Sequence, residues 1–270
     1  MDTVLSGDGA EISYLSIGHG PSVIAIPGAL ALAADYASFA SSLAEHFAVH
    51  TIDRRGHGLS SPQGDDYSMA KEREDVLALQ RKTGASLLVG HSYGGLVALE
   101  AARNNMSLTK VAVYEPGVSI GGSIPMDWMP RYEKELAEKK YLDAFVEFSR
   151  AAGPDRARKT PHWLMKLFIP LIIRSYKRQQ MLRLLPDNLR EHQEVARLDS
   201  SYENYREITA SVLLMYGGKS GTAWVNLAME RLPTVLPCSE AKEFPALDHF
   251  GIDQKAPREV ARAVSEYFLR

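Results

Sequence analysis

The stretch Ser86-Leu-Leu-Val-Gly90-His91-Ser92-Tyr93-Gly94-Gly95 contains the pattern G-x-S-x-G, with glycines two positions before and two positions after Ser92. An apolar run typical of a buried strand leads into the pattern, and a small-residue segment typical of a helix, residues 95–104, follows it. A sharp strand-to-helix turn strains the backbone of its central residue, and flanking glycines leave room for that turn. We therefore expect the Ser92 hydroxyl to project above the end of the strand, at a helix N-terminus that favours negative charge.

The first half of the chain alternates strand patterns with helix patterns, which predicts an α/β fold. Ser6-Gly7-Asp8-Gly9 is typical of a hairpin turn, so the sheet is expected to begin with an antiparallel pair. The later strands are apolar runs separated by helices, as in right-handed parallel crossovers. The expected strands are residues 2–5, 11–17, 22–26, 48–52, 86–89 and 110–114, and the expected helices are residues 34–45, 69–82 and 95–104.

The alternation stops after Tyr114, and no convincing strand pattern returns before Ser211, 211 − 114 = 97 positions later. An ordinary loop of this length is not expected, because loops rarely exceed about 12–15 residues. The sequence instead predicts an inserted helical module, with helical patterns over residues 131–150 and 163–185. After it, we expect strands at residues 211–216 and 241–244 and helices at residues 224–232 and 257–269, which gives a sheet of about eight strands. The predicted division is a core of residues 1–117 and 209–270 with an insertion of residues 118–208.

Composition and charge narrow the function classes. The chain has 270 residues, with 31 Lys and Arg against 33 Asp and Glu, and a formal net charge of −2, which argues against a general nucleic-acid binder. The single Cys238 cannot form an internal disulfide, and residues 1–10 lack the pattern of a signal peptide, so a cytoplasmic location is expected. The apolar stretch at residues 163–173 is shorter than the ~20 residues that a membrane span requires. We expect no metal, because H-E-x-x-H and paired-cysteine spacings are absent from the sequence.

Residues 156–190 are locally basic, with nine Lys or Arg side chains against the single acid Asp187. These side chains are interpreted either as the solvated faces of amphipathic helices or as a contact for an anionic substrate or a membrane surface. Both interpretations stay open at the level of sequence. The sequence carries no signal for the oligomeric state.

A second motif, Asp53-Arg54-Arg55-Gly56-His57-Gly58-Leu59-Ser60, looks like the D-x-R-G-x-G-x-S turn that follows the fourth strand in many α/β hydrolases. Together with the Ser92 motif, the Pro27-Gly28 turn and the late His249, it gives four landmarks in the order found in that superfamily. The chain therefore resembles the α/β-hydrolase superfamily over nearly its whole length. The resemblance implies a mostly parallel sheet flanked by helices, an inserted helical lid, and serine hydrolase chemistry without a cofactor.

The resemblance also implies a catalytic triad, with Ser92 as nucleophile and His249, in Pro245-Ala-Leu-Asp-His249-Phe, as base. Relatives usually place the acid three residues beyond a glycine after the strand at residues 211–216, but this chain has Ser220 there. The alternative position in the superfamily is the end of the preceding strand, where Glu115 stands. Glu115 is therefore the expected acid, while a Ser–His dyad or another acid stays open.

The oxyanion hole implied by the resemblance consists of the backbone N–H groups of Tyr93 and Ala29. Pro27 replaces the histidine that relatives often carry in the second turn, but a backbone donor does not depend on that side chain. The apolar residues of the insertion, Trp163, Leu164, Met165, Leu167, Phe168 and Ile169, indicate either an apolar substrate pocket or packing of helices onto the core.

The expected function is hydrolysis of an ester-like, small-molecule substrate through an acyl-enzyme. Two alternatives use the same fold and triad: hydrolysis of a C–C bond in a diketone-like substrate, and cofactor-free peroxidase chemistry. A third alternative is a non-catalytic ligand receptor, for which Ser220 in place of the usual acid is the only support.

Overall fold

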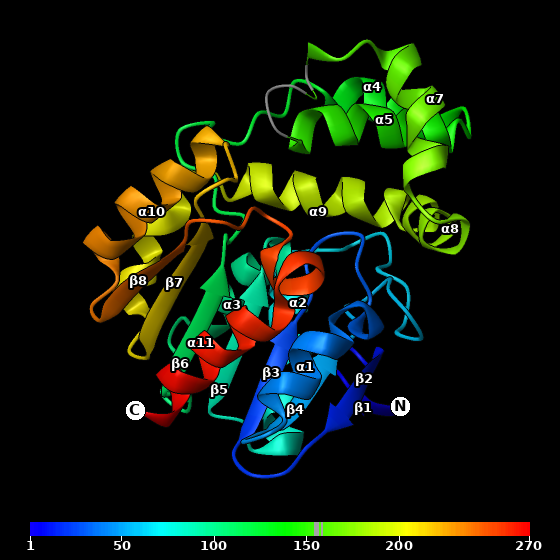
Figure 1. The fold of residues 1–270 in the computed structure, drawn as a ribbon. Helices are drawn as coiled ribbons and strands as arrows, with labels where there is room; N and C mark the ends of the chain where they lie inside the picture. The colour runs from blue at the N-terminus through cyan, green and yellow to red at the C-terminus, as the bar shows by residue number, and fades with distance from the viewer. Residues whose placement is uncertain (154–156, 158) are drawn as a thin grey trace.

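The computed structural model describes residues 1–153, 157 and 159–270, and its centre is an eight-stranded sheet (Figure 1). The strand order is β1-β2-β4-β3-β5-β6-β7-β8, and only β2 runs against the other strands. The expected mostly parallel α/β sheet with an antiparallel start is therefore confirmed. The strands are β1 Asp2–Leu5, β2 Glu11–Ile17, β3 Ser22–Ile26, β4 Ala48–Ile52, β5 Leu87–His91, β6 Lys110–Tyr114, β7 Ser211–Gly217 and β8 Ser239–Phe244.

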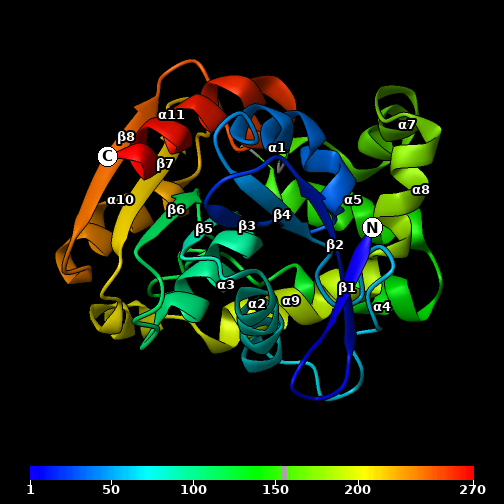
Figure 2. The ribbon, with the colours of Figure 1, turned by 90° about the horizontal axis from the view of Figure 1, so that it is seen from below.

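The central strands form because their side chains are apolar on both sides, and helices bury both faces of the sheet. The helices α1 Ala37–Leu43 and α11 Pro257–Leu269 pack together on one face. The other face is covered by α2 Met69–Thr83, α3 Tyr93–Ala102 and α10 Ala223–Val235, as the view along the sheet shows (Figure 2). Short 3₁₀ segments at Ala33–Tyr36 (η1) and Ser201–Glu207 (η2) and a π-helical turn at Gly251–Lys255 (η3) complete the core.

Of residues 118–208, which we call the insertion, the described helices lie together at one end of the sheet, with α9 lying across that end, whereas η2 packs against α10 of the core (Figure 1). Their helices are α4 Met129–Ala137, α5 Tyr141–Ala152, α7 His162–Ile172, α8 Ser175–Arg183 and α9 Leu185–Arg197. The helical pattern expected over residues 131–150 is divided at Lys139, whose φ angle is 57°. The insertion has a hydrophobic cluster of its own, which includes Trp128, Tyr132, Phe145 and Leu185 and also covers Leu30 of the core.

Two side chains of the basic segment form ion pairs with acidic side chains of the same chain. Lys166 Nζ lies 2.8 Å from both carboxylate oxygens of Asp143, and Lys177 contacts Asp35. Arg156 and Arg158, two of the nine basic residues, lie outside the described residues. Of the apolar residues expected to line a pocket or pack on the core, Trp163, Leu167 and Phe168 are exposed, whereas Ile169 is buried in the cluster of the insertion itself. No helix in the described ranges is long and apolar enough to cross a membrane.

Candidate active site

Ser92 occupies a strained turn between β5 and α3, with φ 53° and ψ −122°. The turn needs glycine at positions 90 and 94. A Cβ atom on Gly90 would lie 2.3 Å from the Gly94 carbonyl oxygen, and one on Gly94 would lie 2.3 Å from the Ile26 carbonyl oxygen. Gly28 of the turn after β3 also lies close, since a Cβ atom there would be 3.1 Å from Ser92 Cβ. The glycines of the motif are thus required by close packing, and they leave Ser92 facing the turn at Gly28.

His249 and Glu115 form a direct hydrogen bond, with His249 Nδ1 2.7 Å from Glu115 Oε2. An ionised carboxylate can only accept, so the imidazole carries its proton on Nδ1 and leaves Nε2 with a free lone pair. Neither His249 Nε2 nor Ser92 Oγ has a hydrogen-bond partner within the described part of the chain. The hydroxyl and the ring nitrogen are therefore both available to a substrate, and such contacts often tighten only when one is bound.

The Glu115 carboxylate is fully buried, and its second oxygen is also satisfied. Oε1 accepts a hydrogen bond from Gly217 N–H at 2.8 Å and a short one from Ser220 Oγ. The function of Ser220 as a donor to Glu115 was missed at the level of sequence, where this residue counted only as a missing charge. The sequence did contain a signal for this contact. Ser220 stands at the usual position of the acid, so its hydroxyl is expected to lie within reach of a carboxylate, such as that of Glu115, that takes over the function of the acid.

Two other carboxylates near His249 differ from Glu115 in their contacts. Asp248 accepts from Phe250 N–H at 3.1 Å and forms a short ion pair with Lys255, so both of its carboxylate oxygens have other partners. Asp253 lies in η3, where burial raises its pKa to about 6, and the nearby imidazole of His249 acts against that rise. A carboxyl that is half protonated near pH 6 is a weaker partner for an imidazolium than an ionised one, so Glu115 is the better-placed acid.

The expected oxyanion donors are backbone N–H groups at Ala29 and Tyr93. Neither group has an acceptor among the hydrogen bonds of the described residues, whereas Gly28 N–H donates to Tyr36 Oη at 3.1 Å. Tyr93 N–H begins α3 and Ala29 N–H belongs to the turn that lies against Ser92. The two N–H groups thus belong to two different elements that meet at Ser92.

His91 connects the turn at Gly28 with the loop of His249. Its pKa lies well below the ordinary value, chiefly because it is buried, so the ring is neutral. His91 Nε2 lies 2.8 Å from the His249 carbonyl oxygen and must donate to it, which leaves Nδ1 to accept from Tyr36 Oη at 2.5 Å. The side chain of His91 is thus directed to these two partners.

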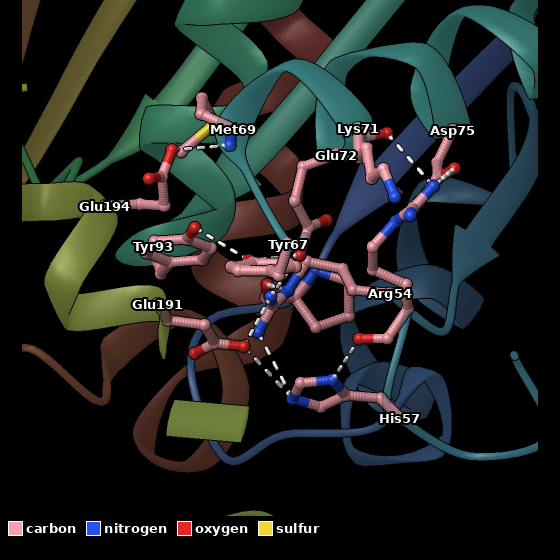
Figure 3. A network of polar contacts seen from close by, with 12 residues as sticks. Arg54, His57, Tyr67, Met69, Lys71, Glu72, Asp75, Tyr93, Glu191 and Glu194 are labelled. Atoms are coloured by element: carbon pink, nitrogen blue, oxygen red, sulfur yellow. Dashed lines mark hydrogen bonds and ion pairs between the residues drawn. The ribbon is translucent and has the colours of Figure 1, made fainter. Parts of the chain in front are cut away.

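Arg54 lies at the centre of a buried polar cluster beside the site (Figure 3). Its guanidinium contacts Glu72 of α2 at 3.0 Å and Glu191 of α9 at 2.6 Å, and its carbon Cζ lies 4.9 Å from the centre of the Tyr93 ring. Burial raises the pKa of Glu72 to about 7 against the opposing effect of Arg54. Burial lowers the pKa of His57 well below its ordinary value, and the charge of Arg54 adds to this shift.

The described residues contain no group of three His, Cys, Asp or Glu side chains arranged to hold a metal ion. The polar side chains around Ser92 are instead engaged with one another, as shown above for Glu115, His249 and His91. The arrangement offers a free hydroxyl, an imidazole lone pair and two backbone donors, which is the set of groups that acyl transfer to a serine requires.

A sequence model described as the Alpha/beta hydrolase family matches residues 23–263, which is most of the chain. The chain belongs to the alpha/beta hydrolase family. Among solved structures, this alpha/beta hydrolase is similar to an alpha/beta hydrolase from Sphaerobacter thermophilus DSM 20745, with a TM-score of 0.81 and 28% identity over 99% of this chain and 100% of the other. The enol-lactonase from Burkholderia xenovorans LB400 shares the fold, with a TM-score of 0.75 and 18% identity over 100% of both chains.

Among curated proteins, the alpha/beta hydrolase described here is 32% identical over 143 residues to a pimeloyl-[acyl-carrier protein] methyl ester esterase from Xanthomonas campestris pv. campestris (strain B100). The match covers 53% of this chain and 49% of the relative. The chain thus spans about half the length of the curated relatives it matches.

Proposed function

We propose that this alpha/beta hydrolase is a cofactor-independent serine hydrolase that cleaves an ester-like bond, in a carboxylic ester, lactone or thioester, of a small apolar substrate. The observation that carries the proposal is the 2.7 Å contact between His249 Nδ1 and the fully buried Glu115 carboxylate. A buried carboxylate in this position orients the imidazole and stabilises the imidazolium that forms when the base takes a proton.

In the proposed mechanism, Ser92 Oγ attacks the substrate carbonyl carbon while His249 Nε2 takes the hydroxyl proton. The negative charge that develops on the carbonyl oxygen is stabilised by the N–H groups of Ala29 and Tyr93. His249 then passes its proton to the leaving group, and the acyl-enzyme forms. Water activated by the same imidazole releases the acid and regenerates Ser92.

The insertion is proposed as a lid domain over a core of residues 1–117 and 209–270. Its own hydrophobic cluster and its position at one end of the sheet support this division (Figure 1). Its cluster reaches Leu30, which follows the proposed donor Ala29, so apolar side chains of the insertion lie next to the site. This neighbourhood favours an apolar acyl or alkoxy group, and the resemblance to a methyl ester esterase supports an ester substrate.

The proposal is tested by labelling with a fluorophosphonate probe, which needs no knowledge of the natural substrate. We expect labelling of the wild type, none of Ser92→Ala, and at least a 100-fold slower reaction of His249→Ala, because the hydroxyl is then no longer activated; the factor follows the range of about 10²–10⁴ for general base catalysis. Glu115→Gln is expected to react about 10-fold or more slowly, since an amide does not stabilise the imidazolium.

Two matched variants separate the acid from its neighbours. Asp248→Asn and Asp253→Asn alter carboxylates close to His249, and both are expected to keep the labelling rate of the wild type within about two-fold. A slow Asp253→Asn together with a fast Glu115→Gln would assign the acid to Asp253. A wild type that is not labelled between pH 6 and 9 would exclude an activated serine and favour the non-catalytic receptor.

A further inference from the structure

We infer that Arg54 is a positioning residue that holds the Ala29 N–H toward the reacting carbonyl oxygen and couples this donor to helix α9 through Glu191. The inference rests on the proposed function, because it concerns the oxyanion site of the same reaction. Arg54 occupies a variable position of the D-x-R-G-x-G-x-S pattern, so the pattern itself assigns it no function.

Arg54 fixes the orientation of the Gly28–Ala29 peptide group. The Gly28 carbonyl and the Ala29 N–H belong to the same peptide unit, and in a trans peptide these two groups point in opposite directions. Arg54 Nη2 donates to Gly28 O at 3.2 Å, and Arg54 Nε donates to Pro27 O at 3.1 Å. Holding the carbonyl on the side of Arg54 fixes the N–H on the opposite side.

The Arg54 guanidinium has five N–H donors for hydrogen bonds. Nε and one Nη2 donor are used by the turn at Pro27 and Gly28, and Nη2 also lies 3.3 Å from His57 Nε2. Nη1 contacts both Glu72 at 3.0 Å and Glu191 at 2.6 Å. Since there is an acceptor for each of the five donors, Arg54 has none left for a substrate, and its function is to position the turn.

Arg54 also connects the turn at Gly28 with the insertion. Arg54, Glu72 and Glu191 are almost completely buried, and Glu191 is the only one of the three that belongs to the insertion (Figure 3). A displacement of α9 would remove a charged partner from Nη1 and change how the guanidinium is held. The position of α9 and the orientation of the Ala29 N–H are therefore linked by one rigid, planar side chain.

The positive charge of Arg54 also acts on the Gly28–Ala29 peptide group. A donor that carries a full positive charge polarises the Gly28–Ala29 peptide group and makes its N–H a stronger donor. This effect matters most when the bound oxygen becomes negative, which happens in the transition state and not in the bound ester. Loss of the contact should therefore lower kcat more than it raises KM.

The test compares Arg54→Lys with Arg55→Lys, using hydrolysis of p-nitrophenyl butyrate and inhibition by a phenylboronic acid. Arg55 is a matched control, because it is equally buried and paired with Asp75, yet none of its hydrogen bonds to described residues reaches the turn at Pro27 and Gly28. Lysine keeps the charge but cannot donate to both carbonyls from one plane. For Arg54→Lys we expect kcat to fall by about 10- to 100-fold with KM within about two-fold, less than the loss of a whole oxyanion donor.

The boronic acid forms a tetrahedral adduct with the serine, so its affinity should fall with kcat in Arg54→Lys and stay unchanged in Arg55→Lys. Glu191→Gln keeps the side-chain shape and is expected to lower kcat by about 3- to 10-fold, and the Arg54→Lys/Glu191→Gln double variant should lose less than the product of the two single effects. If Arg54→Lys does not fold, the single variant Glu191→Gln carries the test alone.

An equal loss of kcat in Arg55→Lys, or an unchanged kcat in both Arg54→Lys and Glu191→Gln, would overturn the inference. Fluorophosphonate labelling distinguishes this failure from failure of the proposed function. A wild type that is labelled at Ser92 while kcat is insensitive to Arg54 rejects the positioning function only. A wild type that is not labelled rejects the serine mechanism itself and the inference with it.

Discussion

Ser92 and Glu115 have positive φ angles, 53° and 44°, in a region that side chains other than glycine rarely adopt. Each follows the last residue of a neighbouring parallel strand, β5 or β6. The two residues therefore leave the sheet at the same edge through sharp turns, and the turn at Glu115 places its carboxylate 2.7 Å from His249 Nδ1. The backbone strain is a direct cost of placing these two side chains of the proposed triad.

Replacing Ser92 by glycine should stabilise the protein, because glycine adopts this backbone conformation without a steric penalty. We expect the free energy of unfolding of Ser92→Gly to exceed that of Ser92→Ala by about 1 kcal/mol, since strained backbone conformations cost about 1–3 kcal/mol and glycine adds chain entropy to the unfolded state. Urea unfolding measures the difference. The control is Ser41→Gly in α1, which should lose stability as glycine does in an ordinary helix. Equal stability of Ser92→Gly and Ser92→Ala would contradict the strain.

The contact between Ser220 and Glu115 leads to a second prediction. Ser220→Ala removes a hydrogen bond to a buried carboxylate, and we expect the rate of ester hydrolysis to fall by about 10-fold, which corresponds to about 1.4 kcal/mol. Ser220→Asp restores the commoner acid of the superfamily, but it places a second carboxylate against Glu115, so the rate should fall further. Ser22→Ala, at a serine that donates to Thr83 O, is the control and should keep the wild-type rate. A faster Ser220→Asp variant would show that the acid site tolerates either position.

Helix α2 begins without a hydrogen bond to the side chain of its own N-cap residue, Ser68. Its first amide is instead bound by the insertion, because Met69 N–H donates to Glu194 Oε2 of α9 at 2.6 Å (Figure 3). A carboxylate at this end of a helix is favoured by the free N–H groups and by the helix dipole. The insertion thus contributes a cap to a helix of the core.

Glu194→Ala should therefore destabilise the first turn of α2, although the substitution lies in another helix. We expect a loss of about 1 kcal/mol in the free energy of unfolding and faster hydrogen exchange of the amides of Met69 to Lys71. Glu203→Ala removes an exposed glutamate that, within the described ranges, forms an ion pair with Arg206 alone, and it should change neither quantity. Unchanged exchange in Glu194→Ala would mean that water replaces the carboxylate at no cost.

The elements of the core could be predicted to within a few residues because buried parallel strands are continuous apolar runs, and such runs are visible locally. The insertion was predicted less well. A break such as that at Lys139 is a positive φ at a residue other than glycine, which no local pattern announces. Side chains such as Trp163 and Phe168 are apolar in sequence whether they are buried or exposed.

The places of Ser92, Glu115 and His249 in the fold were predictable, because a motif or a strand end fixes them. The contacts of Arg54 with Glu191 and of Met69 with Glu194 were not predictable. They join residues that are 137 and 125 positions apart and depend on how the insertion lies on the core. Periodicity describes single elements, so it carries no information about such contacts.

The stability of the whole molecule should depend on pH through its buried histidines. In α9, burial between the rings of Trp128 and Phe148 lowers the pKa of His192 to about 4. The unfolded chain takes up this proton near pH 6.5 and the folded protein only near pH 4, so the contribution of His192 to stability falls as the pH is lowered through this range. Glu72, whose pKa is raised to about 7, acts in the opposite direction.

Because these contributions oppose each other, the difference between variants is the useful measurement. Between pH 7 and pH 5, we expect the free energy of unfolding of the wild type to change relative to His192→Gln by on the order of 2 kcal/mol toward lower stability. Urea unfolding at the two pH values measures this change. His46→Gln, at an exposed histidine, should follow the wild type. Parallel pH dependence of the wild type and His192→Gln would contradict a neutral buried ring.

The ion pair between Arg54 and Glu191 has a consequence for the exchange of substrate specificity among related enzymes. A helical segment that starts and finishes at one place can be grafted from one hydrolase to another without cutting the sheet, and here Ser200 N–H, which follows α9, donates to Ser119 O at 3.0 Å. A graft that lacks a carboxylate at the place of Glu191 would leave a buried guanidinium short of a partner, which costs about 3–5 kcal/mol when a buried pair is broken. We therefore expect such a graft to misalign the turn at Pro27 and Gly28, unless the grafted helix has a glutamate at the place of Glu191.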